Sequence, residues 1–217
     1  AMAHAVESYA MLSKNPLSDA HAVQAIGLIR SSLLDVIKTP DNKDGRLALA
    51  TAATLAGIAF SNSMVGMVHA LGHSFGSVCH VPHGTCMAIL LPYGLEYNLH
   101  KVEERVAELL LPLEGPAAHS RTRPQDRAQA AIASIRQFNE DLDRATNGMH
   151  ATCFKDLRDR EGNQMVPAAV LPEVAKTALG DGAAFYNPED VDYSEWLMVA
   201  QASWKGAPLD LTRIRKG

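Results

Sequence analysis

The sequence has few cysteines, few aromatic residues and no excess of charge of one sign. Cys79, Cys86 and Cys153 are its three cysteines, without a CxxC spacing, which argues against a disulfide framework or a thiolate zinc site and favours a reducing, cytoplasmic compartment. With 20 Lys and Arg against 24 Asp and Glu, the net charge is −4, so no positive field is available for nucleic acid or an anionic membrane.

Long apolar runs and strand patterns are also missing. No run reaches the roughly 18 residues of a membrane span, and the first residues lack the basic and apolar regions of a signal peptide. There is no alternation of Val, Ile and Thr typical of strands, no repeat, and no GxGxxG or GxxxxGK[ST] phosphate loop. These absences argue against a sheet, a solenoid and a nucleotide site within these residues.

The sequence does contain helical periodicity in a chain of 217 residues, 47% of them hydrophobic, enough for one domain with a sizeable core. Apolar residues recur every three or four positions in residues 1–13, 22–37, 47–60, 64–75, 84–98, 101–111, 125–146, 167–179 and 189–204. We predict an all-α multi-helix bundle of about eight helices over residues 1–217. We also predict a helix cap at residues 17–19, a kink or break at Pro92 and a loop over residues 114–124.

Histidine is frequent, with nine in the chain and five between His69 and His100. His69 and His73 are four residues apart, so a helix places both imidazoles on one face, and a helix–loop–helix corner could turn His83 towards them. Such pairs more often pack or cap than bind metal. Here, however, the surroundings are apolar and rich in glycine, where a buried imidazole needs a partner.

Three neutral imidazoles suit Fe(II) or zinc better than calcium or magnesium. His4, with Glu7 one turn further along the first helix, is a candidate for a further member of the group. Taken by itself, His4 is more typical of an ordinary surface or capping residue.

Several stretches together resemble the iron-containing (group III) alcohol dehydrogenases. They are residues 56–62, 66–73, 82–84 and 90–98, together with residues 4–7 and 186–188. The His-x3-His-x9-His run is the most specific of these. The resemblance covers nearly the whole chain and implies the C-terminal helical domain of this dehydroquinate synthase-like fold. It also implies an N-terminal nucleotide-binding domain, which these 217 residues do not contain.

The resemblance implies a divalent metal, Fe(II) or zinc, held by one aspartate and three histidines that map onto His4, His69 and His83. The aspartate belongs four residues before the first histidine, at the position preceding Ala1. Because Ala1 already lies in a helical pattern without a cap residue, we expect the chain to be the C-terminal part of a longer protein, inactive alone. His73 matches a histidine near the substrate, where it would act as a catalytic proton relay.

The implied reaction is reversible oxidation of a small alcohol to an aldehyde or ketone, with hydride transfer to NAD or NADP and the metal as Lewis acid. The partners would be that substrate, the protein's own nucleotide-binding domain and, in a homo-oligomer, further copies of the chain. Met87 replaces an Asn found in many relatives, and His80 adds an imidazole that fits a loop position better than a ligand position.

Three other readings stay open. They are a metal-free reductase of the same superfamily, a zinc enzyme similar to glycerol dehydrogenase, and a non-enzymatic helical interaction module with buried structural histidines. The three ligand-type histidines argue against the metal-free reductase.

Overall fold

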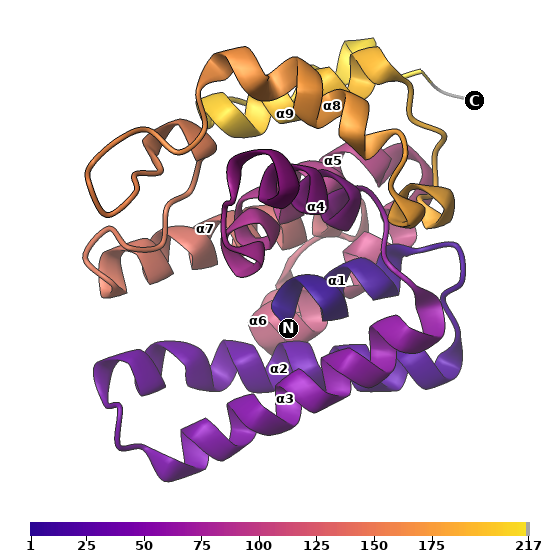
Figure 1. The fold of residues 1–217 in the computed structure, drawn as a ribbon. Helices are drawn as coiled ribbons and strands as arrows, with labels where there is room; N and C mark the ends of the chain where they lie inside the picture. The colour runs from indigo at the N-terminus through magenta and orange to yellow at the C-terminus, as the bar shows by residue number, and fades with distance from the viewer. Residues whose placement is uncertain (216–217) are drawn as a thin grey trace.

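The chain folds as an assembly of helices. The computed structural model describes residues 1–215, which form nine α-helices and five short 3-10 helices (Figure 1). The α-helices are α1 (Met2–Ala10), α2 (Pro16–Lys38), α3 (Lys43–Ser63), α4 (Met67–Cys79), α5 (His83–Glu108), α6 (Leu110–Arg121), α7 (Arg127–Ala145), α8 (Leu171–Ala178) and α9 (Tyr193–Lys205). The 3-10 helices are η1 (Pro124–Asp126), η2 (Phe154–Asp156), η3 (Ala168–Val170), η4 (Gly182–Tyr186) and η5 (Leu211–Arg213). The all-α prediction is confirmed, with nine α-helices in the described residues against the about eight predicted.

Helix α2 has its cap at Asn15, before the residues 17–19 predicted to supply it. The Asn15 side chain accepts hydrogen bonds from the backbone N–H groups of Leu17 and Ser18, and the Ser18 hydroxyl accepts one from the Asn15 N–H. Pro16 opens the helix, where its missing N–H costs no hydrogen bond. The helix ends at Lys38, with Thr39 as its C-cap residue.

The chain between residues 83 and 121 differs from the sequence prediction in two places. Pro92 lies inside α5, and the backbone leaves helical angles at Val102 instead (φ −130°, ψ 24°). The predicted loop over residues 114–124 is mostly helical, because α6 runs through it with one interruption at Gly115. Gly115 adopts φ 79°, a conformation that glycine reaches without strain, and Pro116 directly after it is compatible with the start of a new helical turn.

Helix α4 lies at the centre of the molecule, between the α2–α3 pair and the α8–α9 pair (Figure 1). It packs on α5 and α8, and the side chains of Val68, Leu71 and Phe75 are almost fully buried. A Cβ atom at Gly94 would lie 2.5 Å from Cγ2 of Val68, a short β-branched side chain with little freedom to move, so glycine at this position allows α5 to approach α4 closely. This packing fixes the position of the histidines that α4 and α5 carry.

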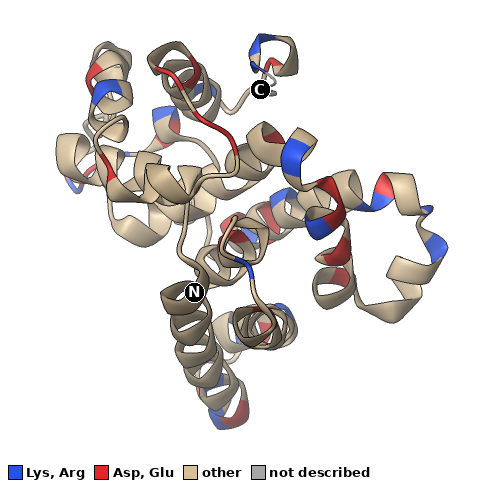
Figure 2. Cartoon of the chain, turned by 90° about the vertical axis from the view of Figure 1, so that its right-hand side faces the viewer, with Lys and Arg blue, Asp and Glu red and all other residues tan. Residues whose placement is uncertain are grey.

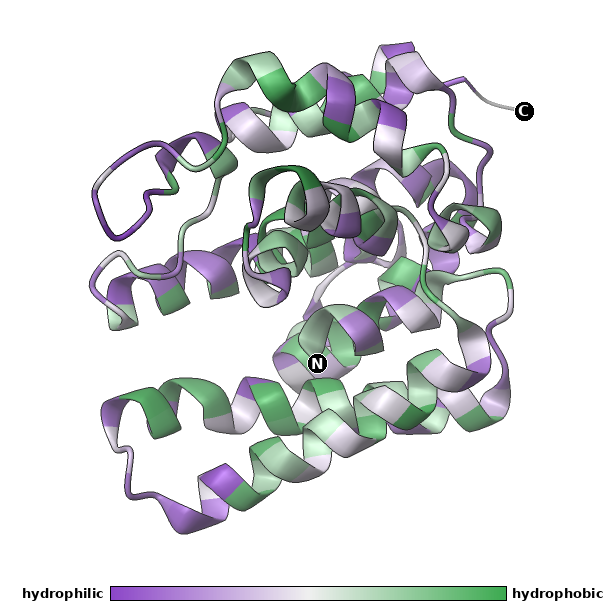
Figure 3. Ribbon diagram, viewed as in Figure 1, coloured by the Kyte–Doolittle hydropathy of each residue, from purple (hydrophilic) through white to green (hydrophobic). Residues whose placement is uncertain are grey.

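The surface carries charges of both signs interspersed along the chain (Figure 2), and hydrophobic positions run through most helices (Figure 3). Within the described residues, α2 is the one helix long and apolar enough to cross a membrane, while α3 and α4 meet the same criterion only as a pair bent by 108°. Ala22, Ile26 and Ile29 of α2 are buried in the hydrophobic core. Length and composition of this kind also occur in core helices, and here α2 contributes one face to the core.

Candidate metal centre

His4, His69 and His83 come together from three different helices. The potential ligand atoms of these side chains lie within 4.8 Å of one another. The ring centroid of His69 lies 4.5 Å from that of His4 and 5.5 Å from that of His83. Because metal–imidazole bonds are about 2.0–2.1 Å long, small side-chain rotations bring all three nitrogens onto one ion. The spatial convergence predicted from the sequence is therefore present in the structure.

Each of the three histidines lies in the first turn of its helix: His4 in α1, His69 in α4 and His83 in α5. Helical side chains lean towards the N-terminus of their own helix, so the N-terminal ends of three helices surround the imidazoles. The N-terminal ends of α1 and α5 have no side-chain cap and carry partial positive charge, whereas the first N–H groups of α4 are hydrogen-bonded to Glu7 and Asn187. The two uncapped ends therefore favour a negatively charged ligand atom beside the imidazoles.

The pKa values of two of the three imidazoles, His4 and His83, are lowered by burial and by neighbouring groups. Burial lowers the pKa of His4 to about 3, with the neighbouring His69, the α-amino group of Ala1, His83 and His73 contributing in that order. Burial, followed by His69 and His73, lowers the pKa of His83 as well. Neutral imidazole is the form that coordinates a metal ion. His4 and His83 are thus in the coordinating form at neutral pH.

His69 is the most buried member, with 1% of its surface exposed. Its Nδ1 is hydrogen-bonded to Oε2 of the buried Glu7, whereas its Nε2 is buried without any hydrogen-bond partner. A buried polar atom without a partner is costly in a folded protein. A metal ion would satisfy this nitrogen, so the residues present fit iron or zinc on chemical grounds.

His73 lies next to the cluster but is not one of the three converging side chains. Its ring centroid is 5.7 Å from that of His69 and 5.7 Å from that of His83. Its Nδ1 is hydrogen-bonded to Oδ2 of Asp181 at 2.9 Å, and 45% of its side chain is exposed. This leaves Nε2 of His73 available for proton exchange with solvent or a bound molecule.

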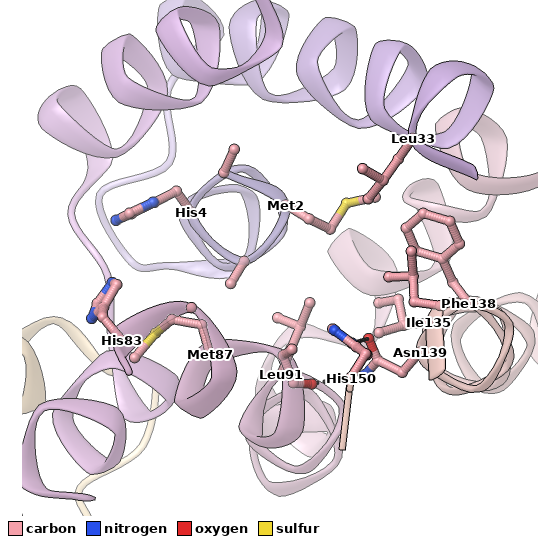
Figure 4. Close-up of a pocket in the computed structure, with 15 residues that line it drawn as sticks. Met2, His4, Leu33, His83, Met87, Leu91, Ile135, Phe138, Asn139 and His150 are labelled. Atoms are coloured by element: carbon pink, nitrogen blue, oxygen red, sulfur yellow. Dashed lines mark hydrogen bonds between the residues drawn. The ribbon is translucent and has the colours of Figure 1, made fainter. Parts of the chain in front are cut away.

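A cavity of about 180 Å³ opens beside His4 and His83 (Figure 4). Its walls are mainly apolar, and the polar side chains of Asn139 and His150 lie at the end away from His83. Met87, four residues after His83 on α5, contributes its side chain to the wall. His73 is not among the residues that line this cavity, although its ring is stacked on that of His83.

Comparison with known proteins assigns the family. Residues 1–203 match the model described as Fe-containing alcohol dehydrogenase family, C-terminal. The chain belongs to the iron-containing alcohol dehydrogenase family. The 1,3-propanediol dehydrogenase of Klebsiella pneumoniae is 35% identical over 188 residues, which are 87% of this chain and 45% of that protein. The NADPH-dependent butanol dehydrogenase of Clostridium saccharobutylicum is 27% identical over 97% of this chain and 50% of that protein.

A solved structure agrees with this family assignment. The crystal structure of a 1,3-propanediol oxidoreductase superposes with a TM-score of 0.82 at 32% identity, covering 93% of this chain and 49% of that one. The chain thus spans about half the length of the iron-containing alcohol dehydrogenases that it matches. The helical fold described above is therefore that of the C-terminal region of the family.

His80 lies outside the cluster of His4, His69 and His83. It caps the C-terminus of α4 in a left-handed conformation (φ 56°, ψ 27°), and its side chain is exposed. This location agrees with the loop position predicted for His80 from the sequence.

Sequence reasoning assigned no role to Glu7 or Asp181, the two carboxylates that contact imidazoles of the site. Glu7 gives a visible signal, because it is a lone acidic residue in helix α1, which contains no Lys or Arg. Asp181 gives none, because it lies 108 residues from His73 in the sequence. Only the packing of η4 on α4 brings the two together.

Proposed function

We propose that this chain is the metal- and substrate-binding part of an NAD(P)-dependent alcohol dehydrogenase, with His4, His69 and His83 as the protein ligands of Fe(II) or zinc. The observation that carries the proposal is the buried, unpartnered Nε2 of His69 beside two further imidazoles. A non-enzymatic module with structural histidines would pair this nitrogen with a hydrogen-bond partner. The family membership supports the same conclusion.

The substrate in this proposal is a small alcohol or the corresponding aldehyde or ketone. When bound, the ion supplies a Lewis acid for the substrate oxygen and the nicotinamide exchanges hydride with the substrate carbon. The three imidazoles would hold the ion, and the uncapped N-terminal ends of α1 and α5 favour negative charge on a neighbouring substrate oxygen. The nicotinamide would be held by a nucleotide-binding domain outside these 217 residues.

His73 is the catalytic residue in this proposal. Its Nδ1 donates to the Asp181 carboxylate, because an ionised carboxylate only accepts hydrogen bonds. Nε2 is then the atom that takes up or releases the proton of the substrate hydroxyl. The partial exposure of the His73 side chain connects this nitrogen with solvent, as a proton relay requires.

A reducing compartment fits the proposal, since Cys79, Cys86 and Cys153 are all free thiols. Burial raises the pKa of Cys86 to about 12, so this thiol stays protonated at neutral pH. The cytoplasm is the compartment that we propose on this basis.

Metal titration of purified variants tests the function. We expect the chain to bind one equivalent of zinc or Fe(II) at neutral pH, and His69→Ala to abolish that binding while the helical circular dichroism is retained. His21→Ala is the matched control, because His21 lies on α2 and its Nδ1 contacts only the backbone oxygen of Leu17. A folded wild-type chain that binds neither metal would refute the proposal and favour a module with structural histidines.

A further inference from the structure

Glu7 lies on α1, one helical turn after His4, and only 1% of its surface is exposed. Burying a carboxylate is costly unless donors surround it. Here Oε1 accepts hydrogen bonds from the backbone N–H groups of Gly66 and Val68, at 2.9 and 2.8 Å, and Oε2 contacts Nδ1 of His69. Each of these three partners is a group that can donate, so the carboxylate fits its surroundings as an acceptor.

These contacts determine which nitrogen of His69 carries the proton. A carboxylate offers only acceptor sites, so Nδ1 of His69 is the donor, and in the neutral imidazole Nε2 then carries the lone pair. Nε2 is the buried atom without a hydrogen-bond partner, and the ring that bears it packs beside His4 and His83. The lone pair thus belongs to the nitrogen for which the fold provides no other partner.

We propose that Glu7 is a positioning residue for the metal ligand His69, an inference that rests on the proposed metal site. It holds His69 in the Nδ1–H tautomer with Nε2 free to coordinate. It also ties α1, which carries His4, to the first turn of α4, which carries His69. One carboxylate therefore sets the tautomer of one ligand and holds together the two helices that carry His4 and His69.

A purely structural role for Glu7 is the competing explanation. Helix α4 has Gly66 as its cap residue and lacks a side-chain cap of its own. Its first N–H groups are satisfied from elsewhere: those of Gly66 and Val68 by Glu7, and that of Met67 by the side chain of Asn187 at 3.1 Å. A capping role would affect the stability of the fold, but it would not affect the tautomer of His69.

Two substitutions separate the roles. In Glu7→Gln the amide oxygen can still accept from Gly66 and Val68, but the amide NH2 then faces Nδ1 of His69. Nδ1 must become the acceptor, and the proton moves to Nε2, where it blocks coordination. Asn187→Ala is the matched control, because it removes a buried cap of α4 and leaves the carboxylate–imidazole contact intact.

The measurements are zinc calorimetry of the 217-residue chain at neutral pH and nitrogen-15 NMR of its histidines. We expect Glu7→Gln to weaken zinc binding by about 10- to 100-fold, the usual effect of losing an outer-shell partner, and to move His69 to the Nε2–H tautomer. Asn187→Ala should keep the wild-type zinc affinity and the Nδ1–H tautomer even where it lowers the unfolding midpoint. Equal zinc affinity in wild type and Glu7→Gln would overturn the proposal, as would equal losses in both variants.

The wild-type chain alone provides a test that does not depend on the folding of a variant. In the metal-free chain, His69 should be the Nδ1–H tautomer, and zinc should shift the Nε2 resonance while the Nδ1 proton stays in place. An Nε2–H tautomer in the wild type would overturn the role of Glu7. Wild-type protein that binds no zinc would instead overturn the metal site itself, so the two failures are distinguishable.

Discussion

The metal-free chain should lose stability on the acid side of neutrality because of the histidine cluster. The pKa of His4 is about 3 in the folded protein, against about 6.5 for an unperturbed imidazole. Below pH 6.5 the unfolded chain therefore binds a proton that the folded chain does not, and the free energy of unfolding falls until the pH reaches about 3. His83, whose pKa is also lowered, adds to the effect in the upper part of this window.

For one such proton, the free energy of unfolding can fall by at most about 1.4 kcal/mol per pH unit. His4 is partly exposed, so solvent screening makes the slope of unfolding free energy against pH smaller than this maximum. Urea unfolding of wild type, His4→Ala and His21→Ala between pH 4 and 7 measures this slope. The slope should be clearly shallower in His4→Ala, whereas His21→Ala, a substitution on α2, should follow the wild type. Identical slopes in all three proteins would refute the account of His4 as an imidazole held neutral by burial.

Three further predictions concern packing and ligand assignment. Gly94→Ala should destabilise the chain by about 1–3 kcal/mol in urea unfolding, because its Cβ would overlap Cγ2 of the β-branched Val68 on α4. Gly57→Ala, with open space around it, should stabilise the chain by about 0.5–1 kcal/mol; a tolerated Gly94→Ala would contradict the close approach of α4 to α5. His73→Ala and Asp181→Ala should leave zinc affinity unchanged in calorimetry, because this pair lies outside the three ligands; a large loss would make His73 a ligand. A chain extended upstream, so that an aspartate precedes Ala1, should bind zinc more tightly, because a carboxylate offsets the charge that three neutral imidazoles leave uncompensated; equal affinities would count against a carboxylate ligand there.

Much of the fold and part of the site could be predicted from the sequence alone. Helical periodicity shows which segments are helices, because the side chains that face the core recur every three or four residues. The spacing of His69 and His73 places both on one face of α4 for the same reason. The short corner between α4 and α5 reverses the chain, and this local feature favours the return of His83 towards His69.

The remaining features depend on contacts between segments that are far apart in the sequence. His4 lies 65 positions before His69, and the periodicity of its own helix does not indicate that they meet; the family resemblance supplied that expectation. The partner of His73, Asp181, depends on how η4 packs against α4. Local signals also mislead where packing decides, since Gly115-Pro116 indicates a loop but interrupts α6 at only one residue.

The most direct test of the central claim is a crystal structure of the chain with zinc, using anomalous scattering to locate the ion. We predict one strong peak among His4, His69 and His83, about 2.0–2.1 Å from one nitrogen of each ring, with Nε2 as the donor atom of His69. A zinc peak at other residues, or well-ordered imidazoles with no peak between them, would contradict the assignment of these three histidines as a metal site.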